Sequence, residues 1–253
     1  PPRSTPKPSS AASDVYKRQI IYGINTIKEL LKTKPKIIKK IFYSGSRIEN
    51  LNLKKDINFV KKVSKKELNE ITGNDDNQGI AILVKKPDLL NYDNLKKNIN
   101  NLGRVVVILD HIMDTHNLGA IIRSGLFFGI KTFIIPNKRA ATISPGSVKS
   151  SSGLIFNSDI YTVSNIINTI NLFKENDYWV IGADLFGEDL YSEKVGRYEN
   201  MKTLLVFGSE GKGLSKLVKD NCDFPISIKG NKNIDSLNVS VAAGIIMSRF
   251  RDK

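Results

Sequence analysis

The order of apolar and polar residues predicts strands and helices that alternate from residue 104 to the C-terminus. The segments RVVVILD (104–110) and KTFIIP (131–136) are almost wholly apolar, as in strands that are buried on both faces. Further strand candidates are the segments 158–163, 177–185, 204–208 and 223–228. Helical or loop-to-helix patterns lie at 111–129, 144–156, 165–175 and 239–250. This alternation predicts an α/β fold with a mostly parallel sheet and helices on both faces.

The first part of the chain predicts a smaller α/β unit over residues 20–86. Its expected elements are a helix within 21–33 capped by Asn25, a strand at 36–45, helical patterns at 51–62 and 65–71, and a turn and strand at 74–86. Residues 87–103 begin at Pro87 and contain one polar helical stretch, so we interpret them as a linker. Residues 104–253 then form the second domain.

Residues 1–19 show no periodicity and are rich in Pro, Ser and Ala. They lack the apolar segment of a signal peptide. We expect a disordered tail, either a transit peptide or a remnant of cloning or sequence assembly. A cytoplasmic protein is therefore expected, with an organellar location as the alternative.

Composition narrows the possible partners. The 253 residues carry a formal charge of +14, and 40% of them are hydrophobic, enough to bury a core. The charge favours a polyanion, more often nucleic acid than an anionic membrane surface. Residues 20–86 hold 15 Lys/Arg against 7 Asp/Glu, so more than half of the net charge lies there. We expect this unit to grip a phosphate backbone, although a lysine-rich surface is usually just solvated.

The remaining composition argues against several kinds of site. No run of eighteen apolar residues exists, which excludes a membrane-spanning helix. The single cysteine, Cys222, excludes an internal disulfide, and with only two histidines we expect no metal site. Cys222 precedes an apolar strand candidate, so we interpret it as a core residue rather than a nucleophile.

Two strand-to-loop transitions near the C-terminus are candidate binding loops. The first is Gly208-Ser209-Glu210-Gly211-Lys212-Gly213, after the strand candidate 204–208; the second leads through Ser236 and Asn238 into a helix. At the carboxyl edge of a parallel sheet such loops bind ligands. The glycine loop matches neither the P-loop nor the dinucleotide-binding pattern, because Gly213 follows Lys212 and Lys216 replaces the third glycine. A simple tight turn is the alternative interpretation.

A third candidate is the segment 110–125. Asn117 precedes an apolar helix and is a good N-cap residue. Arg123 lies among apolar neighbours, where an arginine is costly unless it is paired or used. It is either in a salt bridge, for example with Glu210, or in contact with an anion or a reacting oxygen. Ser236 and Asn238 present the same choice between capping and function.

Three blocks carry a family resemblance. They are DTHNLGA (114–120) through Arg123, FGSEGKGL (207–214) and DSLNVSVA (235–242). In order and spacing they resemble motifs 1, 2 and 3 of the SpoU/TrmH branch of the SPOUT methyltransferases. Residues 20–86, with IYGIN and NQGIA, resemble the RNA-binding domain of the family. Asn77 stands where relatives often have histidine, which bears only on substrate detail.

The resemblance implies a C-terminal trefoil knot, a homodimer and S-adenosylmethionine as cofactor. By position, it implies cofactor-binding roles for Gly208, Gly213, Ile228 and Leu237. It implies a catalytic and ribose-binding cluster formed by Asn117, Arg123, Glu210, Ser236 and Asn238.

The two-domain arrangement is similar to that of the bacterial enzymes that methylate a guanosine 2′-oxygen in 23S ribosomal RNA. The expected activity is therefore S-adenosylmethionine-dependent 2′-O-methylation of a ribose in that RNA. A related enzyme acting on transfer RNA and a non-catalytic RNA-binding module are the alternatives.

Overall fold

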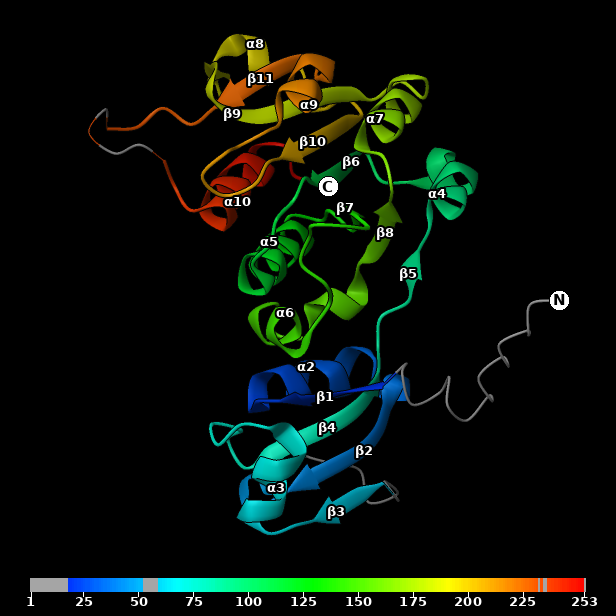
Figure 1. Cartoon of the computed structure of the whole chain (residues 1–253), viewed down its shortest axis with the longest axis vertical. Helices are drawn as coiled ribbons and strands as arrows, with labels where there is room; N and C mark the ends of the chain where they lie inside the picture. Colours follow the sequence, from blue (N-terminus) through cyan, green and yellow to red (C-terminus); the bar gives the residue numbers. More distant parts are fainter. Residues whose placement is uncertain (1–17, 52–58, 232, 234–235, 253) are drawn as a thin grey trace, which may run out of the picture. The chain divides into compact units, whose positions relative to one another are not determined.

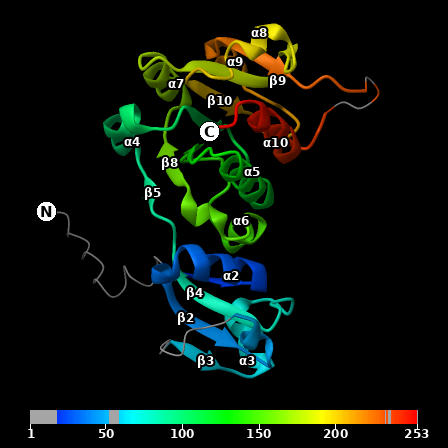
Figure 2. The same cartoon turned by 180° about the vertical axis from the view of Figure 1, so that it is seen from behind.

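The computed structural model describes residues 18–51, 59–231, 233 and 236–252. Contacts between Cα atoms divide the chain into two units, Pro1–Pro87 and Asp88–Lys253 (Figures 1 and 2). The tail predicted for residues 1–17 lies outside the described residues. Arg18 and Gln19, which we assigned to that tail, belong to the first strand instead. The Gln19 side chain is buried there, so the strand begins before the apolar residues do.

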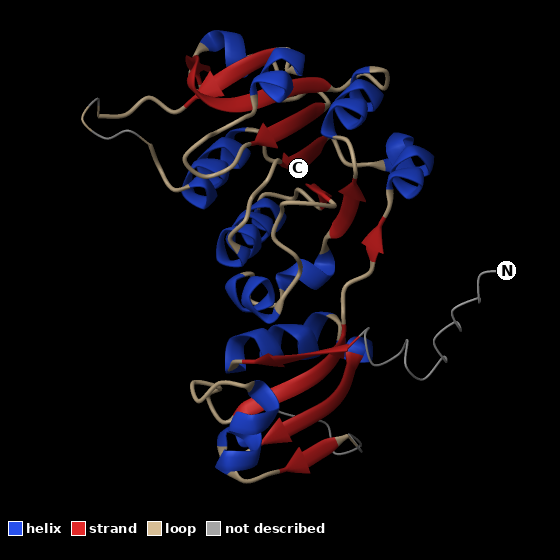
Figure 3. Cartoon of the chain, in the orientation of Figure 1, coloured by secondary structure: helices blue, strands red, loops and turns tan. Residues whose placement is uncertain are grey.

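The described residues of the first unit form a four-stranded sheet with two α-helices (Figure 3). Its strand order is β1 (Arg18–Tyr22), β4 (Ile80–Lys85), β2 (Ile38–Tyr43) and β3 (Val60–Lys62). Strands β1 and β2 run antiparallel to β4, whereas β3 runs parallel to β2. The helices are α2 (Ile24–Thr33) and α3 (Lys65–Thr72), and the 3-10 turns are η1 (Pro35–Ile37) and η2 (Arg47–Leu51).

Side chains alternate between the two faces of this sheet, and each helix of the unit packs on a different face. Helix α3 packs through Leu68 on the face that bears Ile20, Tyr22 and Phe42. Neighbours such as Ile21 point to the opposite face, where they are fully buried. Helix α2 contacts β1 and β4 and buries Ile27 and Leu30. The strands predicted at 36–45 and 74–86 are confirmed as β2 and β4.

Two details of the first unit differ from the sequence prediction. Residues 60–62 form β3, whereas we predicted a helix over 51–62; residues 52–58 lie outside the described residues. Asn25 does not cap α2. The residue before the helix is Gly23, with φ of 104°, and the Ile24 N–H donates to the Gln78 Oε1 atom at 2.9 Å. The first N–H group of the helix thus bonds to a side chain that is distant in the sequence, and not to a local cap residue as we predicted.

Asn77, the departure from the family pattern, closes the turn before β4. Its side chain is buried and donates to Asn69 Oδ1 at 2.7 Å and to the Asn74 carbonyl at 2.8 Å. It also accepts from the Gly79 N–H at 3.0 Å. These bonds give Asn77 a structural role in the turn.

The second unit is built on a seven-stranded, wholly parallel sheet. The strand order is β11 (Phe224–Ser227), β9 (Trp179–Asp189), β10 (Thr203–Phe207), β6 (Val105–Leu109), β7 (Thr132–Pro136), β8 (Asp159–Val163) and β5 (Leu89–Leu90). From β6 the chain continues outward through β7 and β8, and it later returns so that β10 lies beside β6. The boundary between β6 and β10 is therefore where the strand order reverses, the position at which open α/β sheets bind ligands.

Helices cover both faces of this sheet, as predicted. One face packs on α4 (Tyr92–Asn98), α7 (Ile166–Lys174) and α9 (Lys216–Asn221), through a cluster that includes Leu95, Phe173 and Val218. α5 (Thr115–Phe127) is associated with α6 (Pro145–Ser150) and α10 (Val239–Arg249). The short elements η3 (Ile99–Asn101), η4 (Leu154–Asn157) and α8 (Glu193–Gly196) complete the unit.

Residues 88–103, which we predicted as a linker, are integrated into the second unit. Strand β5 pairs with β8, and Leu95 and Ile99 are buried in the core. Because this stretch is mostly polar, the few apolar residues of α4 that pack on the core were not recognised from the sequence. Helices α8 and α9 were also missed, because each is too short to give a helical period.

The contact between α5 and α6 requires a glycine at position 119. A Cβ atom there would lie 1.9 Å from Ser150 Oγ and 2.3 Å from the carbonyl oxygen of Ser147. We predict that Gly119→Ala lowers the free energy of unfolding by about 1–3 kcal/mol, because the crowded helices must separate.

Gly244→Ala in α10 is the matched control, since its Cβ would meet nothing closer than 3.7 Å. Helix propensity should make this variant as stable as the parent, or more stable by up to about 1 kcal/mol. Urea unfolding followed by circular dichroism measures both. Equal unfolding midpoints for the two variants would contradict the close α5–α6 contact.

Candidate functional site

The site lies at the carboxyl ends of β6 and β10. Leu109 and Phe207, the last residues of these strands, are register partners, and the Asp110 N–H donates to the Phe207 carbonyl at 2.7 Å. The loops that follow therefore leave the sheet side by side. One leads into α5 and the other is the glycine loop, although 98 positions separate Leu109 from Phe207 in the sequence.

Asn117 is inside α5 rather than at its cap. The cap is Asp114, whose carboxylate accepts from the His116 N–H at 2.8 Å. Our assignment of Asn117 as an N-cap is therefore wrong, because the helix begins two residues earlier, at Thr115. The Asn117 side chain is buried, with 8% exposure, and a buried amide needs hydrogen-bond partners.

Asn117 finds these partners in two other segments of the chain. Its Nδ2 donates to Glu210 Oε1 in the glycine loop, and its Oδ1 accepts from Asn238 Nδ2 at 3.2 Å. Asn238 is also the N-cap of α10, where its Oδ1 accepts from the Ser240 N–H at 2.9 Å and from Ser240 Oγ at 2.6 Å. The structure thus joins three of the predicted site residues in one network, which we call the amide cluster: Asn117, Glu210 and Asn238.

The amide cluster has unused hydrogen-bonding capacity. Each side-chain amide carries two N–H donors, and the bonds above use only one donor of each asparagine. Glu210 and Asn238 are exposed, so a ligand can reach the cluster from solvent. A group with both donors and acceptors, such as a sugar hydroxyl, fits this set.

The glycine loop is a tight turn, as one of the two interpretations predicted. Ser209 and Gly213 exchange two backbone hydrogen bonds, of 3.1 and 2.9 Å. Gly208 is needed for this closure, because a Cβ there would lie 2.1 Å from the Gly213 carbonyl carbon. Gly211 and Gly213 have φ of 76° and 63°, and the space beside their Cα atoms is open. The turn therefore presents backbone to an accessible edge of the sheet.

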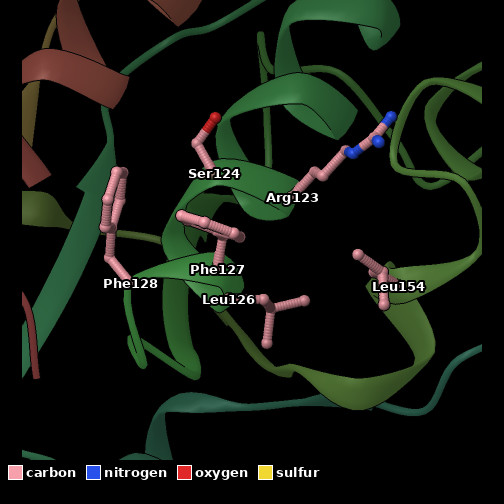
Figure 4. A pocket seen from close by; sticks show the side chains of 6 residues that line it. All are labelled: Arg123, Ser124, Leu126, Phe127, Phe128 and Leu154. Carbon is pink, nitrogen blue, oxygen red and sulfur yellow. The ribbon is translucent and has the colours of Figure 1, made fainter. Parts of the chain in front are cut away.

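Arg123 is not part of the amide cluster. It lies on α5 six residues after Asn117, about 9 Å along the axis and about a third of a turn away around the helix. Its Nη1 donates to Ser152 Oγ at 2.9 Å, and among the described residues it forms no ion pair with Glu210. The interpretation of Arg123 as the partner of Glu210 in a salt bridge is therefore wrong. Arg123 is exposed and borders a hollow of about 490 Å³ with Phe127 and Leu154 (Figure 4).

The other predicted residues surround the third loop. Ile228 is half-buried directly after β11, and Ser236 and Leu237 are exposed directly before Asn238. Residues 232 and 234–235 lie outside the described residues. No described contact links Ile228 or Ser236 to the amide cluster, so their predicted roles stay predictions.

Sequence reasoning missed several neighbours of the site. Ser152 forms a hydrogen bond with Arg123, and Ser240 forms one with Asn238. Only Ser240 could have been recognised in the sequence, because its spacing from Asn238 is that of a helix-capping hydrogen bond. Asp110 is buried at the end of β6 and bonds to His111 Nδ1, and His111 has a left-handed φ of 58°. A carboxylate directly after an apolar strand was the available signal for this pair.

The searched part of the chain contains neither a metal-binding group nor a membrane-spanning helix. In the described residues no three His, Cys, Asp or Glu side chains gather as metal ligands. None of the described helices is long and apolar enough to cross a bilayer.

Sequence comparisons place both units among RNA methyltransferases. The SpoU rRNA Methylase family matches residues 104–248, and the domain "RNA 2'-O ribose methyltransferase substrate binding" matches residues 20–90. A Staphylococcus haemolyticus protein named for the TrmH family of tRNA/rRNA methyltransferases is 34% identical over 236 residues, covering 90% of this chain and 93% of that protein. A Borreliella burgdorferi protein named as an uncharacterized tRNA/rRNA methyltransferase is 36% identical over 212 residues, covering 81% of this chain and 91% of that protein.

Solved structures share the fold over nearly the whole chain. The AdoMet-bound rRNA methyltransferase of Sinorhizobium meliloti has a TM-score of 0.74 at 22% identity, covering 96% of this chain and 90% of that one. The SpoU methyltransferase AviRb of Streptomyces viridochromogenes, in complex with AdoMet, has a TM-score of 0.73 at 20% identity, covering 96% and 92%.

Cys222, the residue after α9, is partly buried and packs against the core, which agrees with our interpretation of it as a packing residue rather than a nucleophile. Burial raises the pKa of its thiol to about 12, and Asp223 and Asp110 add to this effect while Lys174 opposes it. Because the thiolate is the reactive form, we predict slow alkylation of the native protein. At about pH 8 the thiolate fraction should be roughly a thousandth of that of an ordinary thiol.

Reaction with a chromogenic disulfide reagent, followed in native buffer and in denaturant, tests this. The rate should rise steeply on unfolding and, in the native protein, keep rising with pH beyond about 10. Equal native and denatured rates at neutral pH would contradict the raised pKa.

Proposed function

Since this chain belongs to the SpoU rRNA methylase family, we propose that it methylates a ribose 2′-oxygen, that of a guanosine in 23S ribosomal RNA. The amide cluster carries this proposal. It holds a carboxylate and two carboxamides at the reversal point of a parallel sheet, with donors left for a sugar hydroxyl. The RNA substrate-binding domain matched over residues 20–90 supports an RNA substrate.

S-adenosylmethionine fits the glycine loop as cofactor. It supplies, when bound, a methyl group already activated for transfer. The open space beside Gly211 and Gly213 and their left-handed φ angles leave backbone groups of the turn accessible. We propose that Gly208, Gly213, Ile228 and Leu237 hold it, largely through backbone. The two AdoMet-bound relatives with this fold support the assignment.

The side chains of the site then have to orient the ribose so that its 2′-hydroxyl can lose its proton. We propose that Asn117, Glu210, Ser236 and Asn238 bind the ribose, with Glu210 fixing the rotamer of Asn117. The proton of the 2′-hydroxyl leaves to water or to a neighbouring phosphate, and its oxygen would take the methyl group that S-adenosylmethionine supplies by cleavage of the sulfonium S–C bond, which leaves a thioether. A guanidinium stays protonated, so Arg123 acts as a cation rather than as a base, and from its exposed position outside the amide cluster it holds an RNA phosphate.

The assembly that we propose follows the family. Exposed apolar side chains lie on and beside α5 and α10, where a second copy of the chain would cover them: Met113, Phe127, Leu237 and Val241. A homodimer in the cytoplasm and a trefoil knot in the second unit are parts of this proposal. The two domains that we propose, for RNA binding and for methyl transfer, correspond to the two units, so residues 88–103 belong to the second domain.

Transfer of labelled methyl groups tests the function. Full-length protein, S-adenosylmethionine and unmethylated 23S ribosomal RNA should yield 2′-O-methylguanosine, identified by nuclease digestion and mass spectrometry. Label in transfer RNA alone would favour the related transfer-RNA activity. RNA binding without any methyl transfer would leave a non-catalytic binding module and overturn the proposal.

Glu210→Gln tests the role of the carboxylate. A hydrogen bond to a charged acceptor is worth about 1 kcal/mol more than a neutral one, so we predict that kcat falls by roughly fivefold to tenfold. Cofactor affinity, measured by calorimetry, should change much less. Glu193→Gln, an exposed carboxylate on α8, is the matched control. Lost cofactor binding with unchanged kcat would contradict the assignment.

A further inference from the structure

The positive charge of the first unit is concentrated in one stretch. Between positions 28 and 40 there are six lysines and one acid, Glu29. All six lysine side chains are exposed, whereas Glu29 is half-buried. We call these six residues the basic strip: Lys28, Lys32, Lys34, Lys36, Lys39 and Lys40.

The first half of the basic strip is built by α2. The inner side of the helix buries Thr26, Ile27 and Leu30, which leaves Lys28 and Lys32 on the outer side, one turn apart. The helix ends at Thr33, and η1 then carries Lys36 around the corner toward β2. The amphipathic pattern that anchors α2 on the sheet thus aligns its lysines.

A β-bulge builds the second half. In a regular strand, alternate residues face opposite sides, so one of two successive lysines would point inward. The pairing of β2 with β4 shifts register between Ile38 and Lys40. As a result Ile38 and Ile41 are buried while Lys39 and Lys40 are both exposed. Bulges re-aim side chains in this way, often beside functional sites.

Among the described residues of the unit, no acid neutralises the basic strip. In the parts of the chain that the structure describes, none of its six ammonium groups pairs with a carboxylate. The segment that contains α3 differs: residues 64–76 hold two lysines and four acids, and Lys61 pairs with Glu67 at 2.9 Å. Six like charges over this short distance repel each other, and a polyanion relieves the repulsion.

We infer that the basic strip is the surface by which the first unit binds the phosphate backbone of RNA, an assignment that rests on the proposed function. Lysine ammonium groups are point charges that contact phosphates without reading bases. The strip itself contains no aromatic residue, and Lys40 Nζ lies 5.4 Å above the half-buried Phe42 ring. The strip therefore contributes affinity and orientation, and it leaves base selection to other residues.

The salt dependence of RNA binding tests the inference. Two full-length variants, Lys28→Gln with Lys32→Gln and Lys36→Gln with Lys39→Gln, remove two strip charges each and leave the packing of Lys40 intact. Fluorescence anisotropy with a labelled RNA hairpin gives the dissociation constant from about 50 to about 200 mM salt. Each lost phosphate contact should lower the slope of log K against log salt by roughly 0.7 to 0.9. Each variant should therefore lose up to about 1.4 to 1.8 from the slope and bind several-fold more weakly at low salt.

The matched control is Lys65→Gln with Lys66→Gln, two exposed lysines of α3 in the acidic part of the unit. Its slope should equal that of the parent. Unchanged slopes for both strip variants, or an equal loss in the control, would overturn the inference. Methyl transfer by the parent protein is measured alongside and keeps the two proposals distinct. If the parent is active and both strip variants keep its salt slope, only the role of the basic strip is refuted.

Discussion

The parallel pairing of β6 with β10 is the constraint on which the second unit depends. It places Leu109 opposite Phe207, so two loops from remote parts of the sequence begin at neighbouring points. The sheet grows outward from this pair in both directions, and helices close over both faces. The buried strands leave no freedom to shift the register, because a slip of one residue would turn apolar side chains away from their layer.

From that constraint the amide cluster follows. Helix α5 follows β6 after the loop 110–114 and carries Asn117 into the space beside the glycine loop, where Glu210 accepts a hydrogen bond from its amide. Helix α10 is associated with α5 and brings Asn238 to the other side of the same amide. Three segments thus share one buried carboxamide, whose desolvation would be costly without both partners.

In the function that we propose, the two units of the chain contribute by different physical means. The second unit uses directional hydrogen bonds at a fixed sheet edge, where small displacements matter. The first unit uses charge, which acts over several ångströms and tolerates many RNA geometries. Its basic strip needs only an amphipathic helix and one bulge to leave all six lysines exposed to solvent.

The sequence by itself determined the parallel α/β core, the basic first unit and the residue types of the site, because apolar runs and charge are local properties of a chain. Only the tertiary structure decided which of the candidate site residues lie in contact with each other. By its sequence Asn117 is either a helix cap or a site residue; Asp114 is the cap, and the partners of Asn117 lie 93 and 121 positions away. Arg123 shares a motif with Asn117 but points elsewhere, because six residues on a helix do not return to the same face. Pairing and packing between distant segments set these positions, and no local pattern encodes them.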